Sequence, residues 1–101
     1  MKNENAKVLD ALQDLGMTSK ILSRYLLAGD SDKAHEAVTI LLMQGIDHFG
    51  PDSSAMQQFF PVFESIKNRI DQHDLIRALD QTKIFEVQLQ EIIGMMPTGA
   101  P

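Results

Sequence analysis

The feature that most constrains this chain is a stretch of ten residues, 37–46, that is apolar on every side of a helix. Within it only Thr39 and Gln44 are clearly polar. A helix at the surface of a small protein normally has one apolar stripe and one hydrated face. One side of this helix would carry Val38, Leu41, Leu42 and Gly45, and the other would carry Ile40, Met43 and Ile46. Such a helix is either surrounded by its own chain or shares one side with another chain.

Length and composition indicate one folded domain. The chain has 101 residues, of which 44% are hydrophobic, enough for a modest core without a metal or a disulfide. It has no cysteine, so a thiolate nucleophile, a cysteine metal site and a disulfide framework are excluded, and a reducing compartment fits. The first residues are polar, and no apolar run approaches the ~20 residues that cross a bilayer. We therefore expect a cytoplasmic, soluble protein that does not bind membranes.

The charge of the chain argues against nucleic acid as a partner. The net charge is −5, and the nine Lys and Arg residues are scattered from Lys2 to Lys83. Binding to a duplex depends on clustered cations that neutralise phosphates, and anionic membranes require the same clustering. We expect neither kind of partner.

Helical spacing dominates the sequence, and the first helix is expected over residues 4–28. No sustained alternation and no Asn-Gly or Asp-Gly hairpin turn indicates a strand. Steps of four and three residues form an inward seam. Gly16 interrupts this helix, so the alternatives are a stop with a new cap at Thr18 or one continuous helix with a weak point, which we prefer. The seam consists of Val8, Leu12, Leu15, Ser19, Leu22 and Leu26.

Turn and cap residues delimit the next two helices. Gly29 suits a left-handed helix end, and Asp30 or Ser31 caps a second helix that runs to about His48. The segment 50–54 reads as a turn, and Ser54 with Gln57 forms a candidate capping box for the third helix. Pro61 lies inside that third helix and predicts a kink or a break near residues 57–61.

The fourth helix is expected to begin after Asp74 as its cap and to stop at Gly94. The rest of the chain, 95–101, has no periodicity and is expected to be a flexible tail after a single domain of residues 1–94. Four antiparallel helices with short corners predict an all-α, up-down four-helix bundle made of two helical hairpins.

The two hairpins echo each other at a spacing of 44 residues. Both corners read as a helix, a short break, an Asp cap and a new helix. Duplication and shared turn chemistry both explain this, and shared turn chemistry requires less. The matching sets are Leu22, Leu26, Asp30, Lys33 and Ala34 with Ile66, Ile70, Asp74, Arg77 and Ala78.

No residue pattern indicates catalysis, a cofactor or a metal. His35, His48 and His73 lack the Glu-x-x-His spacing of metal-binding bundles, and His73 reads as a solvated helix corner. Asp10 and Asp14 lie one turn apart on a solvated face rather than in a desolvated cleft that would separate their pKa values. We therefore expect no enzyme, with no catalytic, cofactor-binding or metal-binding residue.

What the sequence does have is more apolar surface than four short helices easily enclose. A wide-faced helix in the middle of a compact bundle is one explanation, and a groove or dimer face is the other. Six methionines favour the second explanation, because Met adapts to varied partner surfaces, although Met17 and Met56 are expected to be ordinary core fillers. Met95 and Met96 are candidates for a flexible latch. The candidate partner-binding residues are Ile40, Met43, Ile46, Phe59, Ile84 and Val87.

Two stretches, 28–37 and 69–93, resemble the flagellin export chaperones of bacteria. The first reads Ala-Gly-Asp-Ser-Asp-Lys-Ala-His-Glu-Ala, and the second has Asp74 at its corner. These chaperones are small acidic helical bundles that hold the helices of a secreted subunit. The resemblance implies a binding function of that class.

We therefore expect a small acidic helical module, of adaptor, chaperone-like or regulatory type, that docks helices of another protein or of a second copy through an apolar face. The alternative is an acidic, phage-type decoy that blocks a nucleic-acid-binding protein. That function requires carboxylates along one face at phosphate-like spacing, whereas many acids here have basic neighbours.

Overall fold

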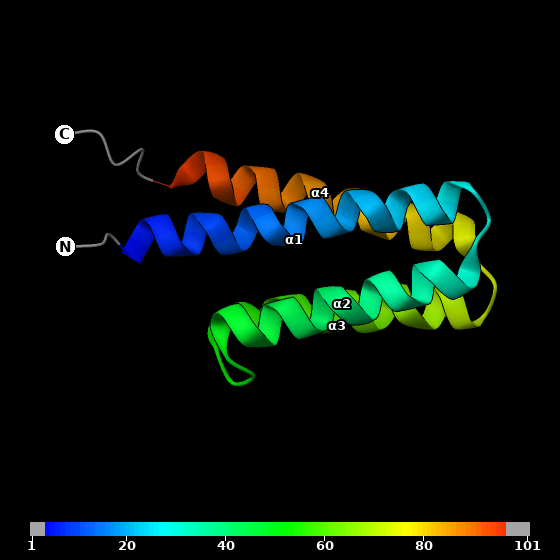
Figure 1. Ribbon diagram of the computed structural model, residues 1–101, viewed down its shortest axis with the longest axis horizontal. Coiled ribbons are helices and arrows are strands. Elements are labelled where there is room, and N and C mark those ends of the chain that lie inside the picture. Colours follow the sequence, from blue (N-terminus) through cyan, green and yellow to red (C-terminus); the bar gives the residue numbers. More distant parts are fainter. Residues whose placement is uncertain (1–3, 97–101) are drawn as a thin grey trace.

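The computed structural model, described for residues 4–96, is a four-helix bundle with up-down connectivity (Figure 1). The helices are α1 (Glu4–Leu27), α2 (Ser31–Phe49), α3 (Ser54–Asp71) and α4 (Leu75–Met95). Each helix packs against the next one in the chain, and α1 also packs against α4. This closes a four-sided arrangement in which α2 and α4 occupy diagonal corners. The predicted fold class is confirmed.

Helix α1 is continuous through Gly16, as the unbroken seam predicts. A methyl group added at Gly16 would meet almost nothing, because the only atom near an ideal Cβ there is Leu89 Cδ1, at 4.0 Å. The inward seam residues from Leu12 to Leu26 are buried, including Ser19, whose hydroxyl donates to the Gly16 carbonyl at 2.8 Å. Val8, near the free end of the helix, is instead partly exposed.

The α1–α2 and α3–α4 corners have the same backbone structure. Gly29 and His73, which are 44 residues apart, both adopt left-handed φ values, 75° and 59°. In the first corner the amide of Asp30 donates to the carbonyl of Tyr25, and in the second Asp74 donates to Arg69. These bonds satisfy helix-terminal carbonyls in the manner of a Schellman motif.

The cap of the following helix is also the same in both corners. The Asp30 carboxylate accepts from the amide of Lys33, and the Asp74 carboxylate accepts from the amide of Arg77. Both aspartates therefore act as the predicted caps. Matching turn chemistry therefore explains the part of the sequence echo that lies at the corners, Asp30 with Asp74 above all.

The α2–α3 corner differs from the prediction by one residue. Gly50 has φ 85°, and Ser53 rather than Ser54 caps α3 by accepting from the amide of Met56 at 3.1 Å. Helix α3 then runs through Pro61 without interruption, so the break that was one alternative does not occur. Pro61 is exposed, so its ring meets solvent rather than the core.

An aromatic cluster fills the half of the core near the α2–α3 corner. Phe63 and Phe85 pack edge to face with centroids 5.1 Å apart, and Phe59 packs against Phe85 at 5.5 Å. Gly45 lies beside this cluster, where α2 approaches α3 closely: an ideal Cβ there would lie 2.6 Å from the sulfur of Met56. The glycine in the apolar run thus permits close helix packing.

The C-terminal end of α4 corrects one expectation. The helix does not stop at Gly94 but continues to Met95, and Met96 packs against the core. Met95 is exposed. The remainder of the expected tail, residues 97–101, lies outside the described residues. Within residues 4–96, no helix combines the length and the apolarity needed to cross a membrane.

Candidate protein-binding face

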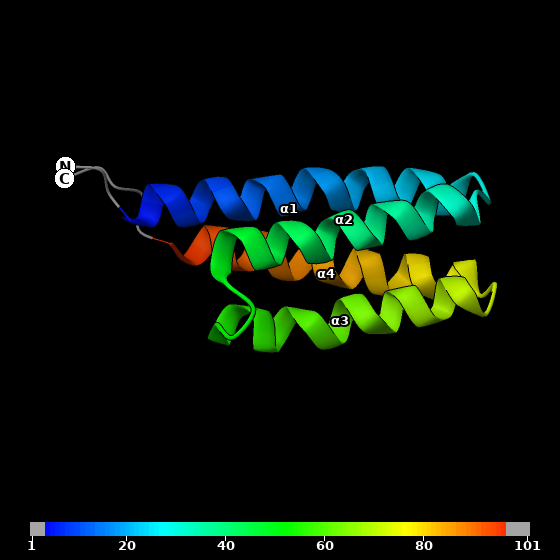
Figure 2. The same ribbon diagram turned by 60° about the horizontal axis from the view of Figure 1, so that its bottom comes forward.

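Three of the predicted contact residues form an exposed apolar ridge along α2. Ile40, Met43 and Ile46 are 48%, 59% and 37% exposed. The opposite side of α2, which includes Val38 and Leu41, is buried. With 3.6 residues per turn, Met43 points straight out of the bundle, while Ile40 and Ile46 flank it toward α1 and α3. In Figure 2 this helix lies in front of the others.

Two polar contacts fix how α1 lies beside this ridge. The Thr18 hydroxyl donates to Oε1 of Gln44 at 2.7 Å, and Nε2 of His48 lies 3.1 Å from Oδ2 of Asp14. In both contacts the two residue numbers add to 62. Because the two helices are antiparallel, a residue of α1 and a residue of α2 lie at the same height along the bundle, or level with each other, when their numbers add to 62.

This register places two more exposed apolar side chains next to the ridge. Ile21 is level with residue 41 and so lies near Ile40, and Met17, one turn further along, is level with Gly45. Both are exposed, and both lie at levels of α1 that are beside α2. The apolar surface therefore extends from α2 onto α1. Neither residue is predicted as a contact from the sequence, and Met17 corrects the expectation of a core filler, because its side chain is 66% exposed.

A third helix contributes Phe60, which is 44% exposed. Nε2 of His35 lies 3.5 Å from Oδ1 of Asp71, so level residues of α2 and α3 add to 106. Phe60 is therefore level with Ile46, on the outward side of the α2–α3 groove. We call the exposed apolar surface around α2 the α2 face, and its members are Met17, Ile21, Ile40, Met43, Ile46 and Phe60.

Phe59, predicted as a partner contact, belongs to the core instead. Its side chain is only 5% exposed and packs against Phe49, Phe63 and Phe85. The third helix must turn one aromatic ring inward and leave the next on its outer side. The structure assigns the inner position to Phe59 and the outer one to Phe60.

The two remaining predicted residues, Ile84 and Val87, lie on a different side of the molecule. Both are exposed on α4. In Figure 2, α4 lies behind α2, in agreement with their diagonal positions in the bundle. Outward side chains of diagonal helices point in opposite directions. A single flat partner surface therefore cannot contact Met43 and Val87 together, and the predicted set divides into two faces.

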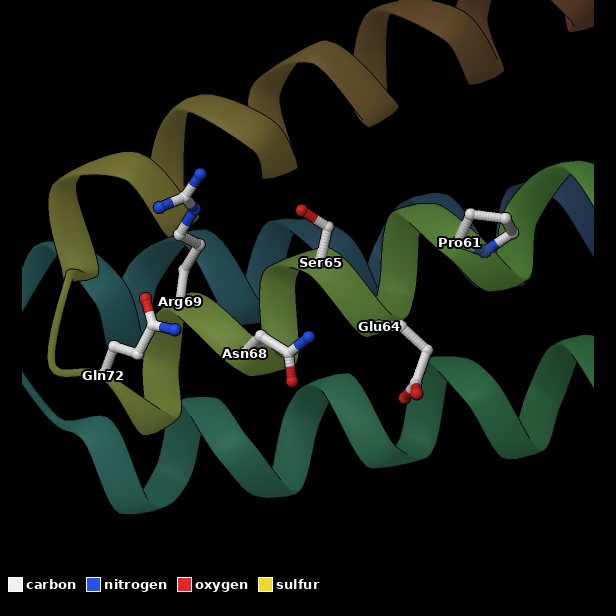
Figure 3. A pocket seen from close by; sticks show the side chains of 6 residues that line it. All are labelled: Pro61, Glu64, Ser65, Asn68, Arg69 and Gln72. Atoms are coloured by element: carbon white, nitrogen blue, oxygen red, sulfur yellow. The ribbon is translucent and has the colours of Figure 1, made fainter.

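A hollow on the outer surface of α3 has no arrangement that suggests chemistry. Its lining residues include Glu64, Ser65 and Arg69. Figure 3 shows that these side chains diverge, because Glu64 leans toward α2 while Ser65 and Arg69 point toward α4. The Ser65 hydroxyl accepts a hydrogen bond from Nε2 of Gln81 at 2.7 Å, and Arg69 lies 3.8 Å from Asp74. These two contacts tie α3 to α4 and its cap.

Charged side chains border the α2 face on two helices. On α1, Asp10 and Asp14 precede Met17, and Lys20 and Arg24 follow it. On α2, exposed Lys33 and Glu36 lie toward one end and exposed Asp47 toward the other. Among the described residues, no group of three or more histidine and acidic side chains is arranged to hold a metal ion. The α2 face is thus an apolar centre with a charged border.

Comparisons with protein-family models, with curated proteins and with solved structures find no match to this chain. The resemblance to flagellin export chaperones therefore stays a prediction, and the α2 face carries the functional interpretation alone.

Proposed function

We propose that this protein is a protein-binding module that docks an apolar helical surface of another polypeptide chain on the α2 face. The observation that carries the proposal is the exposure of six apolar side chains that the registers of α1 and α3 with α2 place around α2. Scattered exposed apolar residues are common in monomeric proteins, whereas a contiguous patch bordered by charges is typical of an interaction site.

The docking energy would come from removing these side chains from water. Burying apolar surface contributes about 25 cal/mol per Å², and the outward position of Met43 makes it the centre of the area that a partner covers. Ile40 and Ile46 flank it in the i, i+3 pattern that helix-in-groove recognition uses. A hollow between α2 and α3, lined by residues that include Leu42 and Lys67, offers a place for a side chain of a partner helix.

The composition of the face favours an adaptor, chaperone-like or regulatory function. Met17 and Met43 have flexible thioether side chains that fit partner surfaces of different shape. The surrounding charges would orient the partner and exclude poorly matched ones, because like charges across an interface are unfavourable. Flexible methionines at the centre would let a chaperone-like module bind related partner helices, and the surrounding charges would limit which partners bind.

The test is a pull-down from extracts of the native host with three baits. Wild type is compared with Met43→Asp, which places a charge in the centre of the α2 face. The matched control is Ile76→Asp, which makes the same kind of change at an exposed isoleucine of α4. We expect at least one protein to be retained by wild type and by the control and lost with Met43→Asp.

The proposal is wrong if all three baits retain the same proteins although all are folded by far-UV circular dichroism. Salt dependence separates it from the decoy alternative. Binding by apolar docking should persist in 1 M salt, where the screening length is about 3 Å, whereas binding of an acidic decoy should be lost.

A further inference from the structure

The part of the α2 face that lies on α1 and α2 matches itself when it is turned about a twofold axis, whereas Phe60 on α3 would be level with the buried Ile66 of the second copy. The axis runs across the face, perpendicular to the helices, and crosses α2 at Met43. It then crosses α1 at Ser19, because residues of α1 and α2 at the same height have numbers that add to 62. A second copy related by this axis would lie antiparallel to the first. Interfaces of this isologous kind are the commonest in homo-oligomers.

The apolar residues satisfy this symmetry on both helices. On α2, Met43 meets its own counterpart, and Ile40 is level with Ile46 of the second copy. On α1, Met17 is level with Ile21 of the second copy, because they are equally far from Ser19 in sequence. The positions of five apolar side chains on two helices are thus consistent with one axis.

The charged residues of α1 and α2 are also compatible with the twofold axis. Arg24 is level with Asp14 of the second copy, and the symmetry produces this opposite-charge pair twice. Lys20 is level with the uncharged Thr18 of the second copy, and Asp47 is level with the uncharged Thr39 of the second copy. Applied to every acidic and basic residue of α1 and α2, the axis places no like charges at the same level. Like charges directly opposite each other would disfavour the pairing.

We propose that the occupant of the α2 face is a second copy of this chain, packed antiparallel about the axis through Met43. This inference rests on the proposed function, since it names the partner of the same face. Self-association and capture of a different helix are then mutually exclusive, because both use Met43.

The experiment is sedimentation of the full chain over protein concentrations from about 1 µM to about 1 mM, the range in which a modest interface dissociates. Wild type should pass from monomer to dimer, and Met43→Asp should remain monomeric. Arg24→Asp and Asp14→Arg should each weaken the dimer about tenfold, because each single change replaces two attractive pairs with two repulsive ones.

The double variant Arg24→Asp with Asp14→Arg restores opposite charges across the axis and should return the dissociation constant to within about threefold of wild type. Lys20→Asp is the matched control, because it makes the same charge change on α1 opposite an uncharged residue. It should weaken the dimer less than Arg24→Asp does. Circular dichroism verifies that each variant is folded.

Three results would overturn the inference: a wild type that is monomeric throughout, a dimer that tolerates Met43→Asp, or a double variant as weak as the singles. If wild type is monomeric while a host protein is still lost with Met43→Asp, self-association is wrong and the proposed function stands. If the pull-down is also insensitive to Met43→Asp, both are wrong.

Discussion

Two glycines in helix interiors should respond in opposite ways to the same substitution. Gly16 and Gly45 both lie within helices, where alanine is intrinsically more favourable than glycine by about 0.8–1.0 kcal/mol. At Gly16 a new Cβ meets only Leu89 at 4.0 Å, which is an ordinary contact. Gly16→Ala should therefore stabilise the protein by most of that amount.

At Gly45 the same Cβ would lie 2.6 Å from the Met56 sulfur and 3.1 Å from its terminal carbon. Met56 is buried, so its side chain has little free space into which to move. Overpacking of this kind costs about 1–3 kcal/mol, which exceeds the gain in helix propensity. Gly45→Ala should be less stable than wild type by about 1 kcal/mol, and less stable than Gly16→Ala by about 2 kcal/mol.

Urea unfolding at one fixed protein concentration measures these differences, with the m-value used to verify that the transition is unchanged. Met56→Val removes the sulfur and terminal carbon, so the two substitutions together should cost about 1 kcal/mol less than their sum. Equal stabilisation by Gly16→Ala and Gly45→Ala would refute the close approach of α2 to α3.

Three further predictions concern stability and are measured by the same unfolding experiment. Pro61→Ala should stabilise by about 1–3 kcal/mol, because it restores a helical hydrogen bond to the Gln57 carbonyl at an exposed site; no change would mean that the carbonyl has another partner. Asp30→Ala should cost about 1 kcal/mol through loss of the cap, whereas a neutral effect would contradict that role. Leu41→Ala should cost about 2–5 kcal/mol and Met43→Ala less than about 0.5 kcal/mol, because only Leu41 is buried. Similar losses for both would place Met43 in the core.

The sequence predicted the architecture because its local signals agree with one another. The seam on α1 passes through Gly16 in register, and Asp30 and Asp74 are strong caps at short corners. Local signals identified the end of α4 less well. Gly94 is a common helix-ending residue, but the next turn still contacts the core through Met96, and this tertiary contact outweighs the local preference.

The candidate face was predicted only in part, because its assembly depends on how helices lie side by side. Periodicity on α2 identified Ile40, Met43 and Ile46 as surplus apolar residues. Periodicity cannot decide between adjacent phenylalanines, so Phe59 is predicted as a contact although Phe60 is the exposed residue. The inclusion of Val87 reflects the same limit, since only the three-dimensional arrangement separates diagonal helices.

The neighbours of the ridge were missed for a related reason. Met17 and Ile21 lie off the α1 seam, and the sequence pattern alone gives them no link to α2. The contacts of Thr18 with Gln44 and of Asp14 with His48 set the register that brings them next to Ile40 and Met43. These polar pairs set the position of α1 against α2, but their members are far apart in the sequence, so the pairing is known only from the structure.

The most direct test of the covered α2 face is hydroxyl-radical oxidation of individual methionines, read by mass spectrometry in dilute and in concentrated protein. In dilute solution Met43 and Met17 should be oxidised rapidly and buried Met56 slowly. In concentrated solution Met43 and Met17 should become protected, while Met95, exposed and outside the face, should keep its rate. Oxidation of Met43 at one unchanged rate in both solutions would contradict self-association through this face, and a dilute rate as slow as that of Met56 would contradict its exposure.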